Sequence, residues 1–295
     1  MRFGDRRSSD NVEYREGGGG GFGFGGGGGN MLLGLVFSRF GIFGVLLLLG
    51  VGWLVGGDPL GLMGGGGVQQ AQNAPANRNA GQVCGTNSTY RFACQTVAST
   101  EDQWSAMFRA MGRTYTAPHM IFYSGGAPGA CGQADSRMGP FYCPVDRGIY
   151  LDTAFFDELA QRFAAPGDFA QAYVIAHEVG HHVQLLMGVE ARVERAKRGA
   201  SETEGNAIQV RMELQADCLA GAWASREQGA MEAGDLEEGM RAAAAIGDDT
   251  LQRAGGGQVV PESFTHGTSA QRQEALMRGY RGGNWAACES YTQGL

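Results

Sequence analysis

The sequence predicts an α+β fold in a chain of 295 residues, preceded by one segment long enough to cross a membrane. Short runs rich in aromatic and β-branched residues come before residue 152, and long helical patterns follow them. Strands grouped ahead of helices are typical of α+β domains. A separate apolar run lies near the N-terminus. We therefore expect a mostly helical domain with a small β-sheet, behind a single transmembrane helix.

The first part of the chain has the composition of a leader and a tether. Residues 1–16 are polar with charges of both signs, and residues 17–29 are glycine apart from Phe22 and Phe24. A glycine tract buries too little apolar surface to offset the entropy of ordering. We expect residues 1–30 to be a cytoplasmic leader joined to a flexible tether.

Residues 31–55 form the apolar run, in which Arg39 is the only charged residue. About 20 apolar residues suffice to cross a bilayer. Arginines are more frequent upstream than immediately downstream, so the positive-inside rule puts the N-terminus in the cytoplasm and the rest in the periplasm or outside the cell. A cleaved signal peptide is the alternative, but the small-residue site at 74–76 lies far beyond the run. A single-pass bacterial membrane anchor is the favoured interpretation.

Residues 56–94 are predicted to be a flexible stalk, and residues 95–295 the main domain. All six cysteines follow the apolar run, which suits an oxidising compartment. We expect neighbours to pair and the last two to tie the C-terminus back, which gives Cys84–Cys94, Cys131–Cys143 and Cys218–Cys288. Buried free thiols in a reducing compartment are the alternative.

The elements of the main domain follow from local patterns. Short apolar runs predict strands at 120–123, 141–143 and 148–151. Capping boxes at 100–103 and 201–204 mark two helix starts. The predicted helices are 100–112, 155–163, 168–188 and 201–224, followed by two or three shorter ones.

The helix at 168–188 carries His177, Glu178 and His181 in the pattern HExxH. Histidines four residues apart lie one turn apart on the same helix face, where they can bind one zinc ion. Glu178 then serves as general base toward a water molecule that zinc activates. Gln184 and Met187 occupy the places where a metzincin has Gly and His, which excludes that class. The alternative is a solvated helix face with no metal.

Glu213 and Asp217 lie four residues apart on the following predicted helix. One carboxylate can bind the metal while the other orients a ligating histidine, a role that suits Asp217. His177, His181 and Glu213 would then hold one Zn²⁺ per chain and leave the fourth position open for chemistry. The alternative is an ordinary surface pair, but the neighbouring residues are small or apolar.

Several motifs resemble a known family. HEVGHH followed by ELQAD resembles the gluzincin metallopeptidases. Five segments in order are similar to the bacterial putative neutral zinc metallopeptidases: MGPFYCP (138–144), YVIAHEVGHHVQ (173–184), RMELQADCLAG (211–221), IGDD (246–249) and SFTHGTSAQR (263–272). The resemblance implies a zincin-like fold of gluzincin type, a zinc cofactor and a membrane anchor. It supplies no substrate.

The same resemblance gives a role to His266. A His or Tyr from another element commonly stabilises the oxyanion in gluzincins, and His266 lies in one of the similar motifs. The alternative is a loop histidine bonded to local backbone.

The leading hypothesis is a membrane-anchored zinc peptidase that hydrolyses peptides or proteins, with Glu178 and His266 as catalytic residues. The alternative is a non-catalytic, zinc-containing scaffold tethered to the membrane. A net charge of −7 and the lack of a basic stripe argue against nucleic acid as a partner. An intramembrane protease is excluded because no other apolar segments could surround the site.

Overall fold

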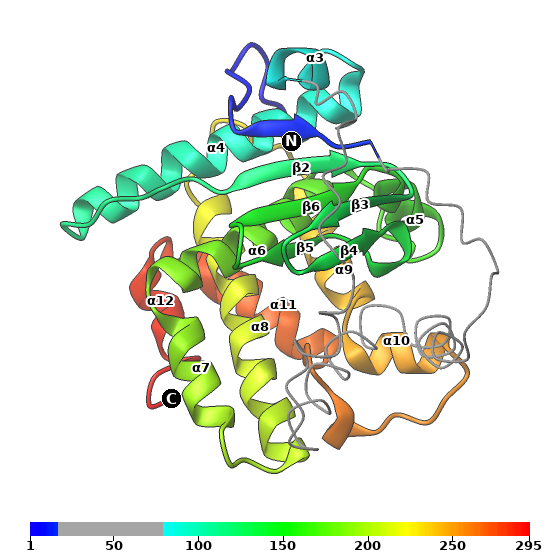
Figure 1. Cartoon of the computed structure of the whole chain (residues 1–295), viewed down its shortest axis with the longest axis vertical. Helices are drawn as coiled ribbons and strands as arrows, with labels where there is room; N and C mark the ends of the chain where they lie inside the picture. Colours follow the sequence, from blue (N-terminus) through cyan, green and yellow to red (C-terminus); the bar gives the residue numbers. More distant parts are fainter. Residues whose placement is uncertain (17–78) are drawn as a thin grey trace, which may run out of the picture.

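The computed structural model describes residues 1–16 and 79–295 (Figure 1). The predicted tether, the apolar run 31–55 and most of the predicted stalk lie outside these residues. Among the helices of the described ranges, none has both the length and the apolar character needed to cross a membrane.

A four-stranded sheet lies on one side of the domain. Its order is β1 (Val12–Tyr14), β2 (His119–Tyr123), β6 (Gly148–Asp152) and β5 (Phe141–Cys143). The first three strands are parallel and β5 is antiparallel to β6. A separate hairpin joins β3 (Gly126–Gly129) to β4 (Gly132–Asp135). The three predicted strands are confirmed as β2, β5 and β6.

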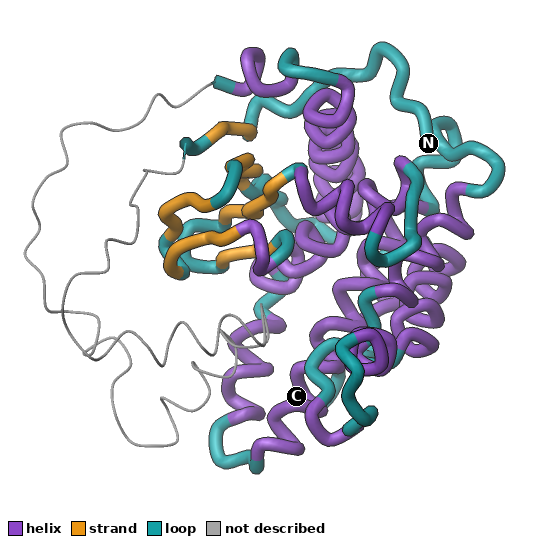
Figure 2. Tube along the Cα trace, turned by 90° about the vertical axis from the view of Figure 1, so that its right-hand side faces the viewer, coloured by secondary structure: helices purple, strands orange, loops and turns teal. Residues whose placement is uncertain are grey.

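Helices make up most of the described chain, as expected for the predicted α+β class. In chain order they are α3 (Ala80–Cys84), α4 (Ser88–Ala110), α5 (Ala154–Gln161), α6 (Asp168–Leu186), α7 (Val189–Lys197), α8 (Glu202–Ala224), α9 (Asp235–Ala245), α10 (Asp248–Ala254), α11 (Ser269–Gly282) and α12 (Trp285–Glu289). Helix α6 contacts β5 on one side and α8 on the other, and α8 in turn contacts α11 (Figures 1 and 2). The candidate site therefore lies on helices between the sheet and α11.

Helices α8 and α11 approach each other through glycines. A Cβ atom on Gly279 would lie 1.7 Å from the carbonyl oxygen of Cys218, and one on Gly221 would lie 2.0 Å from that of Leu276. Only glycine leaves room for backbones this close. This contact brings the side chains of α11 within reach of the carboxylates of α8.

The N-terminal residues are part of the folded domain, which differs from the predicted detached leader. Strand β1 pairs with β2, and the side chains of Met1, Phe3 and Val12 are buried. The Met1 ammonium lies 2.9 Å from the Asp235 carboxylate and also contacts Asp168. The polar composition of this segment predicted a detached leader, but its few apolar side chains pack against the rest of the domain.

Ordered structure also begins earlier than the predicted boundary of the main domain. Helix α4 starts at Ser88 with Asn87 as its N-cap, and the hydroxyl of Thr100 bonds Val97 inside the helix. The predicted helix start at residue 100 is therefore wrong, because local hydrogen bonding can also occur within a helix. The predicted box at Ser201 does cap α8.

All three predicted disulfides are present in the structure: Cys84–Cys94, Cys131–Cys143 and Cys218–Cys288. The first links α3 to α4, and the last ties α12 to the C-terminal half of α8. The C-terminal segment is thus attached covalently next to Asp217.

Candidate metal centre

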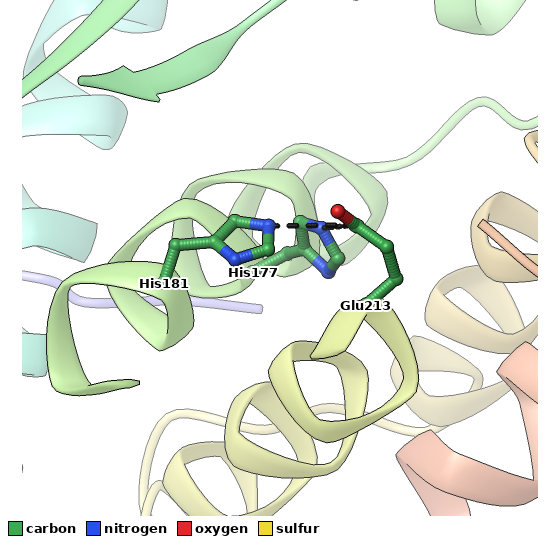
Figure 3. Close-up of side chains that lie close together, drawn as sticks. All are labelled: His177, His181 and Glu213. Atoms are coloured by element: carbon green, nitrogen blue, oxygen red, sulfur yellow. Dashed lines mark ion pairs between the residues drawn. The ribbon is translucent and has the colours of Figure 1, made fainter. Parts of the chain in front are cut away.

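His177, His181 and Glu213 converge from two helices (Figure 3). The Nε2 atoms of His177 and His181 lie 3.3 Å and 3.4 Å from the same oxygen of Glu213, Oε2. The predicted ligands from α6 and α8 are therefore brought together with their lone-pair atoms facing one another. These ligand atoms all lie within 4.8 Å of one another, which is compact enough for one metal ion.

Close packing of the two helices makes this convergence possible. A Cβ atom on Gly180 would lie 2.9 Å from the carbonyl oxygen of Ala216. The glycine stands between the two histidines of HEVGH, so α8 can approach the face of α6 that carries them. A larger residue here would push Glu213 away from the imidazoles.

The electrostatics of the cluster favour positive charge between the three side chains. Burial disfavours a charged imidazole, but the charge of Asp217 and hydrogen bonds to Asp217 and Glu213 outweigh it and raise the pKa of His177 to about 10. Burial also opposes ionisation of Glu213, yet the two histidines hold the pKa of its carboxyl well below the usual range. Two imidazoles and one ionised carboxylate form a donor set that fits zinc.

Asp217 orients His177 from the second helix. Its Oδ1 accepts from Nδ1 of His177 at 2.8 Å and from the hydroxyl of Tyr173 at 2.6 Å. Arg272, which is buried, donates to both carboxylate oxygens at 2.9 Å. Burial opposes ionisation, but the charges of Arg272 and His177 lower the pKa of Asp217 to about 2. An ionised carboxylate only accepts, so His177 carries a proton on Nδ1 and turns Nε2 toward Glu213.

The sequence as a whole matches one protein family. Residues 1–291 match the family described as "Putative neutral zinc metallopeptidase". The chain belongs to this family. Membership in a zinc metallopeptidase family implies a zinc cofactor and supports a hydrolase, in agreement with the donor set of the centre.

Two relatives of this zinc metallopeptidase family member are both described as uncharacterized proteins. The Escherichia coli K12 protein YpfJ is 44% identical over 298 residues, with 100% of both chains covered. The Mycobacterium tuberculosis H37Rv protein Rv2575 is 40% identical over 215 residues, which cover 68% of this chain and 72% of the relative. No solved structure matches the chain.

Glu178, the predicted general base, follows His177 directly on α6 and is only 8% exposed. Burial lowers the pKa of His181 and Glu213 raises it, and the charge of Glu178 adds a smaller rise, so the Glu178 carboxylate lies near the centre. Within the described part of the chain, no hydrogen bond or ion pair engages this carboxylate. The geometry leaves the group free to accept a proton, and its catalytic role stays a prediction.

His266 reaches the same region from the loop after the 3₁₀ turn η2 (Pro261–Ser263). Burial opposes the lowering of the pKa of Glu213 and the two histidines of α6 are its main causes, but His266 also contributes, so it lies near the candidate ligands. Asp248 fixes this loop, since Oδ2 accepts from the backbone N–H groups of Thr265, His266 and Gly267 at 2.8, 2.6 and 2.9 Å. Its other oxygen, Oδ1, lies 3.3 Å from Nδ1 of His266.

His182 has a structural role in this arrangement. It is completely buried, with Nδ1 2.9 Å from the Tyr142 hydroxyl and Nε2 2.6 Å from the carbonyl oxygen of Thr116. Burial lowers the pKa of His182 to about 4, so the ring is neutral at physiological pH. These two bonds fasten α6 to strand β5 and to the segment before β2.

Sequence reasoning did not assign roles to several polar residues around the centre: Tyr173, Gln184, Gln215 and Asp248. Some signals were available. Gln184 lies three residues after a predicted ligand, on the same helix face. Asp248 and Arg272 belong to segments that carry the family resemblance, but nothing in the spacing showed what they contact.

Proposed function

We propose that this chain is a zinc-dependent peptidase of the gluzincin type. The observation that carries the proposal is the convergence of Nε2 of His177, Nε2 of His181 and Oε2 of Glu213, with the opposite ring nitrogens held by hydrogen bonds. Three protein ligands leave one position open, as in catalytic zinc sites. A purely structural zinc site usually has four protein ligands, so the donor set supports chemistry over the scaffold alternative.

In the proposed hydrolysis of a peptide bond, Glu178 and His266 have different roles. A bound zinc ion supplies Lewis acidity that polarises a carbonyl group and acidifies water. Glu178 accepts the proton of the attacking water molecule and delivers it to the leaving amine. His266, oriented by Asp248, donates a hydrogen bond to the oxyanion that develops on the carbonyl. Loss of one such donor costs about 10²- to 10³-fold in kcat, the loss expected for His266→Ala with zinc retained.

Strand β5 supports a peptide as the substrate. It contacts α6, which carries the histidines, and in the described part of the chain it pairs on one side only, with β6. An extended peptide can add to such an edge through backbone hydrogen bonds. A substrate held there would run alongside the helix of the candidate site.

We also propose that the domain works outside the cytoplasm. Three disulfides support an oxidising compartment. The apolar run 31–55 remains our candidate for membrane contact. Because residues 1–16 pack on residues 79–295, we place both on the same side of that membrane, in place of the cytoplasmic N-terminus expected from the arginines.

The decisive experiment measures zinc and hydrolysis in the same preparations of the full chain. We expect about one zinc per chain in the wild type and a sharp loss in His181→Ala and Glu213→Ala. Glu178→Gln should keep the zinc and lose cleavage of a peptide library. No zinc in a folded, reconstituted wild type would refute the metal centre. Stoichiometric zinc without metal-dependent cleavage of any peptide would favour the scaffold alternative.

A further inference from the structure

Two buried glutamines connect His181 to the C-terminal segment. Oε1 of Gln184 lies 2.9 Å from Nδ1 of His181. Nε2 of Gln184 donates to Oε1 of Gln215 at 3.0 Å, and Nε2 of Gln215 donates to Oγ1 of Thr292 at 2.8 Å. Gln184, Gln215 and Thr292 are all completely buried. The series begins at a candidate ligand on α6, crosses to α8 and ends beyond α12.

The direction of this series is fixed by backbone carbonyls. Nε2 of Gln184 donates to the carbonyl oxygen of Met212 at 2.7 Å, and Nε2 of Gln215 donates to that of Cys288 at 3.1 Å. A carbonyl oxygen only accepts, so each amide must turn its NH₂ group toward it. The amide oxygens then point the other way, and the oxygen of Gln184 faces His181.

This direction determines which nitrogen of His181 carries the proton. An amide oxygen cannot donate, so Nδ1 of His181 must be the donor in its contact with Gln184. The lone pair of the neutral ring is then on Nε2, the atom that faces Glu213. At His177 the acceptor for Nδ1 is a carboxylate, that of Asp217, whereas at His181 it is an uncharged amide.

We propose that Gln184 and Gln215 are positioning residues that fix the Nδ1–H tautomer of His181 and so present its Nε2 to the metal. The proposal rests on the proposed function for the identity of the metal. This hydrogen-bond relay, which runs from His181 through Gln184 and Gln215 to Thr292, also links the two helices that carry the candidate ligands, because Gln215 lies on α8. Its far end is held by Cys288, which is joined to α8 by a disulfide.

The test uses the full chain and the variants Gln184→Met and Gln215→Met, which keep side-chain length but cannot form the relay. Gln95→Met is the matched control, since Gln95 is also a buried glutamine that donates to backbone carbonyls, those of Gly4 and Arg6. Zinc affinity is measured by chelator competition. We expect losses of about 10- to 100-fold for Gln184→Met, a smaller loss for Gln215→Met and none for the control.

A second measurement separates this proposal from the proposed function. Long-range ¹H–¹⁵N spectra of the metal-free protein, at a pH where the ring of His181 is neutral, report its tautomer directly. We expect the Nδ1–H form in the wild type and a mixture of tautomers in Gln184→Met. An unchanged tautomer together with wild-type zinc affinity in Gln184→Met would overturn the relay. If the wild type binds no zinc, the proposed function fails, but the tautomer measurement still decides whether the relay fixes the proton of His181 on Nδ1.

Discussion

Arg272 on α11 and Asp217 on α8 form a buried ion pair, with Nε–Oδ2 and Nη2–Oδ1 both at 2.9 Å. The guanidinium keeps the aspartate ionised in a place where burial would otherwise favour its neutral form. An ionised Asp217 is the acceptor that holds His177. The pair therefore links the packing of α11 directly to the orientation of a candidate zinc ligand.

Removal of the arginine should leave the buried carboxylate of Asp217 with only His177 and Tyr173 as partners. We expect Arg272→Met to lower the free energy of unfolding by about 3 to 5 kcal/mol, and Asp217→Asn combined with Arg272→Met to recover part of it. Urea denaturation measures both changes. Arg281→Met, at an exposed position of the same helix, should stay within about 0.5 kcal/mol of wild type. Equal, small effects at both arginines would contradict this account of the pair.

The pH dependence of stability should follow the lowered pKa of Asp217. A carboxyl group with a lowered pKa in the folded state stabilises the protein fully above its unfolded value and loses that contribution as the pH falls. The pKa of Asp217 is about 2, so its contribution should disappear between about pH 4 and pH 2. The stability difference between wild type and Asp217→Asn should be constant between about pH 5 and pH 6 and shrink below pH 4. Above about pH 6 it should also change, because Asp217 raises the pKa of His177. A difference that already vanishes near neutrality would exclude an ionised Asp217.

Zinc binding should be coupled to proton release. The raised pKa of His177, about 10, means that its ring is protonated at neutral pH in the metal-free protein. Zinc must displace that proton, so affinity should rise with pH up to about 10. The charged ring also stabilises the folded metal-free protein, and this contribution decreases with rising pH. It is complete below the unfolded pKa of histidine and is lost as the pH rises through 10. Calorimetry in buffers of different ionisation enthalpy measures the released protons, and an affinity independent of pH would contradict the prediction.

The spacing of α6 and α8 should depend on Gly180. Gly180→Ala would place a methyl group 2.9 Å from the backbone of Ala216, so we expect a loss of about 1 to 3 kcal/mol in unfolding free energy and weaker zinc binding. Gly205→Ala on α8 is the control, because a Cβ atom there meets nothing within 4 Å. The control should be neutral or stabilise the helix by up to about 1 kcal/mol. Unaltered zinc affinity in Gly180→Ala would show that the helices can separate without cost to the site.

The side of the membrane occupied by the N-terminal residues can be tested by labelling. All six native cysteines are paired, so a new cysteine is a unique target. Asp10→Cys and Gln258→Cys place one on each of two exposed positions, in the N-terminal segment and in the main domain. A membrane-impermeant maleimide should label both in spheroplasts to the same extent, because the two regions form one folded unit. Labelling of only one cysteine would show that the N-terminal residues and the main domain lie on opposite sides of the membrane, as the charge pattern predicts.

Much of the candidate site could be predicted because it depends on local geometry. Histidines four residues apart share a helix face in any regular helix, so HExxH fixed the relation of His177 to His181 before any fold was known. Glu213 and Asp217 followed from the same periodicity, and the disulfide partners followed from order along the chain. Local signals failed for the start of α4, where a sequence that resembles a capping box lies inside a longer helix.

The sequence by itself therefore predicted the candidate ligand types, their spacing within each helix and the α+β class. The tertiary structure decided which helices meet and in what register. Arg272 reaches Asp217 across 55 residues, and residues 12–14 reach β2 across more than a hundred, because glycine contacts and buried apolar side chains set those approaches. Helical periodicity constrains neighbours three or four residues apart and carries no information about such distances. The residues that support the candidate metal centre, unlike its candidate ligands, could be identified only in the folded chain.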